Sequence, residues 1–422
     1  MNANYSGILP PGDKPQKQNI REREELRFLL WLLIGSILLS IVYVITEGNI
    51  IIAIAIPIIL LTLATTLYRL DIGLGIFIGF VLLFDQILPR GLNSLTSQFF
   101  YFVNLKQNPH IPNFGIGVLT LMEVHLLMLI GIWLFRLAAN KNAKFISIKL
   151  WFPAILFFIW LIVSFVYGQL RGGDFLSALW EMRALFYLCV MYFFVPQVIQ
   201  TKEQLSMLFW FCIGAIAIKA FQGVFRFIAL GFQFGGFDTL TNSEDPIFII
   251  TLIVLFVALS FFGGNPKQRR ALLYLLPVLL LGFFVGQRRA TYGSFIITMI
   301  AFIFLLPKSQ AYKLLKYLSV FVIILSVYIA IFWNSNSEAG LLAQKIKSMF
   351  YLDATKMSAR DYSSNLYREY ENYNLSMTIR YSPFLGIGFG NKYGQWITFW
   401  GIEKLGLLSY IPHNSILWLF AK

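Results

Sequence analysis

Residues 317–333 have the sequence YLSVFVIILSVYIAIFW, an uncharged stretch long enough to cross the hydrocarbon core of a bilayer as a helix. Other apolar runs of about 16 to 25 residues occupy 28–46, 50–68, 72–88, 117–137, 150–168, 181–199, 205–229, 246–263, 271–287 and 291–306. A further run begins at about residue 414. The pattern predicts an all-α polytopic membrane protein with about 11–12 transmembrane helices.

The composition agrees with this fold class. Of 422 residues, 58% are hydrophobic and 13% are charged, whereas soluble domains carry about 25% charged residues. A soluble domain of ordinary size is therefore excluded. The net charge of +14 does not indicate a nucleic-acid partner, because in a membrane protein excess Lys and Arg first report topology and contact with anionic lipids.

The runs divide the chain into four parts. Residues 1–27 form a polar tail, 28–333 a transmembrane bundle, and 334–413 one large extracytoplasmic loop. Residues 414–422 begin a last helix, and because these nine residues are too few to cross a bilayer we expect a truncated final transmembrane helix.

The distribution of basic residues predicts that the N-terminus is cytoplasmic. With that orientation the inner segments hold 17 Lys and Arg residues and the short outer segments hold 7. The inner set is Lys14, Lys17, Arg21, Arg23, Arg27, Arg69, Arg136, Lys141, Lys144, Lys149, Lys202, Lys267, Arg269, Arg270, Lys308, Lys313 and Lys316. The outer set is Arg90, Lys106, Arg171, Arg183, Arg226, Arg288 and Arg289.

The large loop has order of its own. Residues 341–350 are typical of a short amphipathic helix that lies on the membrane surface. A second helix is predicted because Leu366, Tyr370, Tyr373, Met377 and Tyr381 recur at helical spacing, and Pro383 then stops it. The glycine-rich segment 386–391 predicts a compact turn.

Arg288 and Arg289 stand at a helix–helix junction on the predicted outer face, against the positive-inside rule. Their planar, permanently charged forks suit the oxygens of a phosphate. The alternative interpretation is contact with lipid headgroups at the interface.

His413 and Asn414 are candidate site residues because they stand where the last apolar run begins, at a position where an unpartnered polar pair is costly. A neutral imidazole there accepts a proton from a sugar hydroxyl, and Asn414 caps the helix or orients the ring. The alternative is a purely structural histidine.

Other charged residues are weaker candidates. Arg368 and Arg380 lie on the predicted loop helix but about 120° apart around it, and either is a candidate to close over a substrate. Arg183 starts an apolar run, where an ion pair with Asp174 or a loop residue is the plainer interpretation. Lys219 and Arg226 lie inside an apolar run, so they need partners or a wet cavity.

The chain resembles the O-antigen ligase and O-antigen polymerase superfamily of bacterial membrane glycosyltransferases. The resemblance rests on residues from about 280 to 420: Arg288-Arg289-Ala290-Thr291, Arg368, Ser382-Pro383-Phe384-Leu385-Gly386-Ile387-Gly388-Phe389-Gly390-Asn391 and Pro412-His413-Asn414-x-x-Leu417. It does not separate ligases from polymerases.

The resemblance implies metal-independent, inverting transfer of a polyprenyl-diphosphate-linked glycan to a glycan or lipid-glycan acceptor, at the outer face of a bacterial cytoplasmic membrane. Arg288 or Arg289 would hold the diphosphate, Arg368 would be a second contact, and His413 would act as base or acceptor positioner. No cofactor or metal is expected, since the sequence has no Walker, H-E-x-x-H or paired-acid metal motif. Two alternatives remain: a transporter or flippase for an anionic lipid, and a non-catalytic partner in envelope polysaccharide assembly.

Overall fold

The computed structural model describes residues 35–36, 40–44, 50–85, 95–105, 119–139, 145–146, 148–235, 237, 239–242, 244–335, 337, 340–350, 359–398 and 408–422. The predicted tail 1–27 and most of the run 28–46 lie outside these residues. The described residues are mostly helical, and no strand occurs among them beyond one isolated antiparallel bridge, between Asn104 and Thr120.

The ten predicted apolar runs from 50–68 to 317–333 are helices with nearly the predicted bounds. They are α2 (Ile50–Tyr68), α3 (Leu70–Leu83), α4 (Leu121–Ala139), α5 (Trp151–Leu170), α6 (Phe175–Val198), α7 (Lys202–Ala229), α8 (Asp245–Phe261), α9 (Pro266–Val285), α10 (Arg289–Leu305) and α11 (Lys308–Phe332). Within the described part, six helices are long and apolar enough to span a membrane, and four are shorter apolar helices. The chain is therefore a helical, membrane-embedded protein.

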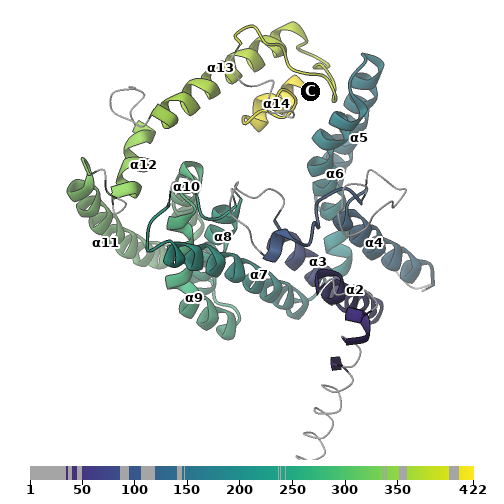
Figure 1. The fold of residues 1–422 in the computed structure, drawn as a ribbon, viewed down its shortest axis with the longest axis horizontal. Helices are drawn as coiled ribbons and strands as arrows, with labels where there is room; N and C mark the ends of the chain where they lie inside the picture. The colour runs from purple at the N-terminus through teal and green to yellow at the C-terminus, as the bar shows by residue number, and fades with distance from the viewer. Residues whose placement is uncertain are drawn as a thin grey trace, which may run out of the picture.

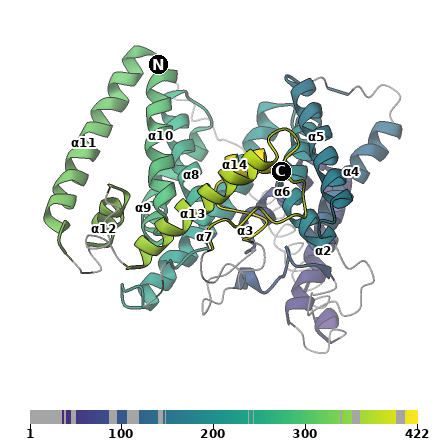
Figure 2. The same cartoon turned by 90° about the horizontal axis from the view of Figure 1, so that it is seen from above.

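The helices form two groups. Figures 1 and 2 show α2–α6 on one side and α7–α11 on the other. The first group packs around Leu74 of α3, Leu129 of α4 and Phe194 of α6, and the second around Ile249 of α8 and its neighbours in α7 and α9. The groups meet where α3 approaches α7 so closely that a Cβ on Gly75 would lie 2.4 Å from the Phe211 ring.

A buried charged network also joins the two groups. Lys219 of α7 pairs with Asp85, which follows α3, and lies 3.4 Å from Asp245 at the start of α8. Thr96 donates to Asp85 at 2.6 Å. Arg226, seven residues or about two turns further along α7, interacts electrostatically with both carboxylates and donates to a backbone carbonyl at 2.7 Å. The expectation that Lys219 and Arg226 need partners is confirmed.

Both predicted loop helices are confirmed: α12 (Leu341–Phe350) and α13 (Ala359–Tyr381), the latter ending just before Pro383. Figures 1 and 2 show α13 and the short α14 (Ser415–Ala421) lying over one end of the bundle, between the two helix groups. The loop helices therefore form part of the folded body.

The glycine-rich turn, residues 386–391, packs between α14 and the helices α5 and α6. Gly386, Gly388 and Gly390 all have positive φ, a conformation that glycine adopts without steric cost. The turn packs directly on α5, where a Cβ on Gly168 would lie 2.1 Å from the Phe389 carbonyl. Glu181 of α6 contacts both the turn and the residue after α14. Its carboxylate accepts from the Gly390 N–H and pairs with Lys422, both at 2.6 Å.

Candidate functional site

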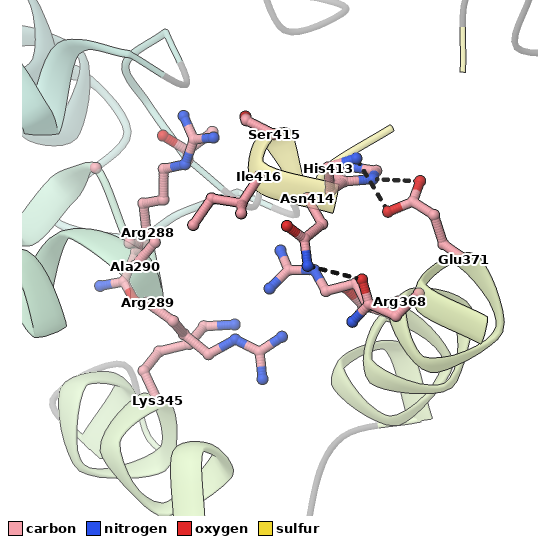
Figure 3. Close-up of a pocket in the computed structure, with 15 residues that line it drawn as sticks. Arg288, Arg289, Ala290, Lys345, Arg368, Glu371, His413, Asn414, Ser415 and Ile416 are labelled. Atoms are coloured by element: carbon pink, nitrogen blue, oxygen red, sulfur yellow. Dashed lines mark hydrogen bonds and ion pairs between the residues drawn. The ribbon is translucent and has the colours of Figure 1, made fainter. Parts of the chain in front are cut away.

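A cavity of about 730 Å³ lies under the loop helices, at the end of the bundle where α9 meets α10. Its walls come from five places in the sequence: the α7–α8 connection at Thr239, the α9–α10 junction, α12, α13 and the start of α14. Figure 3 shows side chains from these elements facing one shared space. The charged and imidazole groups in the lining are Arg288, Arg289, Lys345, Arg368, Glu371 and His413.

The backbone makes a tight turn at the α9–α10 junction, directly before Arg288 and Arg289. Gln287 has φ +45°, a left-handed conformation that is uncommon for a residue other than glycine. Gly286 makes the corner tight, since a Cβ there would lie 2.2 Å from Pro246. Arg288 is the residue before α10 and Arg289 its first residue. The positive end of the α10 dipole thus adds to the two guanidinium charges.

Arg368 and Lys345 face the arginines from the loop. Arg368 comes from α13 and Lys345 from α12, so the cavity is bordered by four cations on three elements. Partial burial, followed by the like charge of Arg289, lowers the pKa of Arg368. Like charges brought this close favour binding of an anion, because an anion relieves their mutual repulsion.

On the other side of the cavity, His413 is held by Glu371 of α13. The Glu371 carboxylate accepts from the His413 backbone N–H at 2.9 Å and lies 3.2 Å from His413 Nδ1. Its side chain is 1% exposed, whereas that of His413 is 46% exposed. With Nδ1 engaged by the carboxylate, Nε2 is the nitrogen left to face a ligand.

Tyr367 and Asn414 make further contacts around the Glu371–His413 pair. Tyr367 donates its hydroxyl to Glu371 at 3.1 Å, and its ring packs edge-on against the His413 ring with centroids 5.5 Å apart. Burial and the charge of Glu371 raise the pKa of Tyr367, so the hydroxyl stays protonated and remains a donor. Asn414 caps α14 by accepting from the Leu417 N–H at 3.2 Å, and its amide donates to Asn372 at 3.0 Å.

The predicted residues therefore fall into two sets. Arg288, Arg289, Arg368, His413 and Asn414 line one cavity, although up to 126 residues separate them in sequence. Arg380, the other arginine of α13, is exposed and is not part of the lining. Arg183 lies elsewhere: it pairs with Glu123 of α4 at 3.2 Å and stacks over the Trp180 ring at 4.5 Å.

Sequence reasoning missed Glu371 as the partner of His413, and it missed Lys345 altogether. For Glu371 a pattern was present. Ser364, Arg368, Glu371 and Asn372 follow the i, i+4, i+7, i+8 spacing of one helix face, and all four line the cavity. For Lys345 the sequence shows only an amphipathic helix with basic residues, and the tertiary fold decides which of them faces the cavity.

The chain matches no protein-family model, and neither a curated protein nor a solved structure shows detectable similarity to it. The assignment of a function thus depends on the motifs in the sequence and on the geometry of this cavity. Among the described residues, no group of three or more His, Cys, Asp and Glu side chains is placed to hold a metal ion.

Proposed function

We propose that the protein transfers a polyprenyl-diphosphate-linked oligo- or polysaccharide to a glycan acceptor, with the cavity at the α9–α10 junction as its active site. One observation carries the proposal: a cluster of cations and a carboxylate-bound histidine face each other across a single cavity. The first suits a diphosphate and the second suits an acceptor hydroxyl. The motif resemblance to O-antigen ligases and polymerases points to the same chemistry.

In the proposed reaction His413 Nε2 takes the proton of the acceptor hydroxyl while that oxygen attacks the anomeric carbon. The bond from the anomeric carbon to the diphosphate oxygen breaks, and the diphosphate leaves with the electron pair. Glu371 stabilises the imidazolium through Nδ1. Because attack and departure take place on opposite sides of the sugar carbon, the anomeric configuration is inverted.

The cations supply the other half of the catalysis. Charge develops on the leaving diphosphate, and Arg288, Arg289 and Arg368 are positioned before the reaction begins. Preorganised donors aimed at developing charge are worth several kcal/mol in a site that excludes bulk water. Neither a nucleotide nor a metal has a part in this scheme, which uses only side chains of the chain itself.

The proposed location is the cytoplasmic membrane of a bacterium, with a cytoplasmic N-terminus and the cavity on the outer side. In a background with Cys189 and Cys212 replaced by alanine, a cysteine at exposed Ser337 is expected to react with an impermeant maleimide in intact cells. A cysteine at Lys267, at the start of α9, is expected to react only after lysis. The reverse pattern would invert the proposed topology.

The test of function is a transfer assay with the purified full chain, radiolabelled lipid-linked donor and candidate acceptors. We expect loss of label from the donor and its appearance on the acceptor without added metal. Donor binding without bond cleavage for any acceptor would favour the transporter alternative. Absence of both binding and transfer would favour a non-catalytic assembly partner.

A further inference from the structure

A second cavity of about 710 Å³ lies between α8, α9, α10 and α11. Its walls are almost entirely apolar, and they include Phe256 of α8, Leu280 of α9, Phe295 of α10 and Phe321 of α11. Figures 1 and 2 show α11 at the edge of its helix group. Of the 25 residues of α11, only Leu314 is buried. In a bilayer an apolar groove of this kind is filled by hydrocarbon chains.

The groove runs from the middle of α10 towards the end of that helix that is farther from the candidate active site. Arg289 begins α10, whereas the groove is lined by Phe295 and Met299 and continues to Lys313, beyond the end of that helix. The 17 residues of α10 span roughly 25 Å. A lipid headgroup bound at the Lys313 end is therefore far from the arginine-lined cavity.

The polar groups at this end are cationic. Lys313 and Gln310 line the groove together with the aromatic ring of Tyr317. Six cations lie within the first nine residues of two helices that line the groove: Lys267, Arg269 and Arg270 in α9, and Lys308, Lys313 and Lys316 in α11. All six are exposed, and within the described residues none of them has an acidic partner.

Gln310 adds an unmet hydrogen-bonding group. Its Oε1 is buried and has no hydrogen-bond partner among the described residues. A buried acceptor without a donor costs free energy, and a headgroup hydroxyl would satisfy it. A ligand with apolar chains, a phosphate and a hydroxyl-bearing headgroup matches the apolar walls, the cations and the unpaired acceptor of the groove.

We propose that the groove between α8, α9, α10 and α11 binds an anionic phospholipid with a hydroxylated headgroup, such as a phosphatidylglycerol. Its acyl chains lie against Phe295 and Phe321, its phosphate binds at Lys313 and Lys316, and its headgroup donates to Gln310. The lipid fills the groove between α11 and the helices α8, α9 and α10. This site is independent of the proposed glycan transfer.

Native mass spectrometry of the full chain tests the proposal, with phosphatidylglycerol or phosphatidylcholine of equal chain length titrated into the detergent micelle. We expect one phosphatidylglycerol to bind at least tenfold more tightly than phosphatidylcholine. Each juxtamembrane cation contributes about fivefold to the affinity for an anionic lipid. The double variant Lys313→Gln/Lys316→Gln should therefore weaken binding by about 25-fold.

Two matched controls separate the groove from general surface charge. Lys202→Gln removes an exposed lysine at the start of α7 that is not part of the groove lining, and should leave the affinity unchanged. Leu280→Trp narrows the groove and should weaken binding, whereas Leu281→Trp, at a similarly exposed neighbour outside the lining, should not. Thermal unfolding verifies that each variant is folded.

Equal affinity for the two lipids would overturn the proposal, as would an unchanged affinity in the double lysine variant. If a polyprenyl phosphate displaced phosphatidylglycerol, and Leu280→Trp weakened the polyprenyl phosphate alone, the groove would belong to the donor tail instead. Glycan transfer is not the readout, so failure here leaves the proposed function standing, and failure of transfer leaves this proposal standing.

Discussion

The molecule contains two clusters of charged side chains that are built in opposite ways. In the network between α3, α7 and α8, the cations Lys219 and Arg226 are matched by the carboxylates Asp85 and Asp245. Among the described residues that line the cavity, four are cations, Arg288, Arg289, Arg368 and Lys345, and Glu371, which is engaged by His413 and Tyr367, is a carboxylate. The first cluster is largely buried between helices, and the second lines an open cavity.

The difference indicates a different role for each cluster. A balanced, buried network has no charge left for a ligand, and removing one member leaves an uncompensated charge in a medium of low dielectric constant. A cavity lined by several cations instead presents a positive field that attracts an anion. Mutations in the first should change stability, and mutations in the second should change activity.

The largest expected effect is on transfer. His413→Ala should reduce the rate by about 10²–10⁴-fold, the usual contribution of a positioned acid–base group. Donor binding should survive, because the arginines remain. A steady-state assay with labelled donor measures the rate, and a binding assay with the same donor measures affinity.

His413→Gln sharpens this result, since the amide keeps a hydrogen bond but cannot take up the proton. High activity in the glutamine variant alone would mean that His413 positions the acceptor. Loss of donor binding in both variants would make it a substrate ligand, and normal activity in both would remove it from the site.

The next effect is on stability. Lys219→Met should destabilise the protein by about 3–5 kcal/mol, because Asp85 and Asp245 are left buried without their cation. Thermal unfolding in detergent measures the change. The double variant Lys219→Met/Asp85→Asn should recover part of the loss, since it removes one uncompensated carboxylate.

Arg289→Gln provides the matched comparison in the cavity. It relieves repulsion with Arg368, so the unfolding temperature should stay equal to that of the wild type or rise. A loss of stability as large as that of Lys219→Met would show that the cavity cations are structural, and the contrast between the clusters would fail.

The third effect concerns the chemistry of the arginines. Arg288→Ala and Arg289→Ala should each reduce transfer at least tenfold, because a hydrogen bond from a charged group contributes about 1.5–3 kcal/mol. Lysine should rescue at most one position, since a point charge lacks the planar fork that pairs with two phosphate oxygens. Wild-type activity in both alanine variants would exclude a diphosphate site at this corner.

Much of the fold could be predicted from sequence, because each spanning helix can be recognised from the length and hydrophobicity of its own segment. The amphipathic spacing of the loop likewise predicted α12 and α13 at their observed positions. The ion-pair partners of buried charged residues were harder to predict. That Lys219 needed a counter-ion was predictable from its apolar surroundings, but Asp85 lies 134 residues away, and no local pattern joins the two.

The candidate site shows the same limit. Arg288, Arg289 and His413 stood out because charge and imidazole are costly beside an apolar helix. Glu371 did not stand out, because an acidic residue on an exposed loop helix is ordinary until His413 is brought against it, 42 residues later in the chain. Arg183 also looked like a site residue, yet its ion pair with Glu123 follows from packing of α4 on α6, which the sequence does not specify.

The smallest expected effect tests whether positive charge matters even at the edge of the cavity. Lys345 and Lys347 lie on the same short helix, but only Lys345 lines the cavity, while Lys347 sits over the Trp333 ring at 5.2 Å. A partly solvated charge pair contributes about 0.2–1 kcal/mol, so Lys345→Ala should lower kcat/KM by up to about fivefold. Lys347→Ala should leave it unchanged at equal protein level. Equal losses in the two variants would mean that α12 acts through general attraction to anionic lipid, and the count of cavity cations would fall to three.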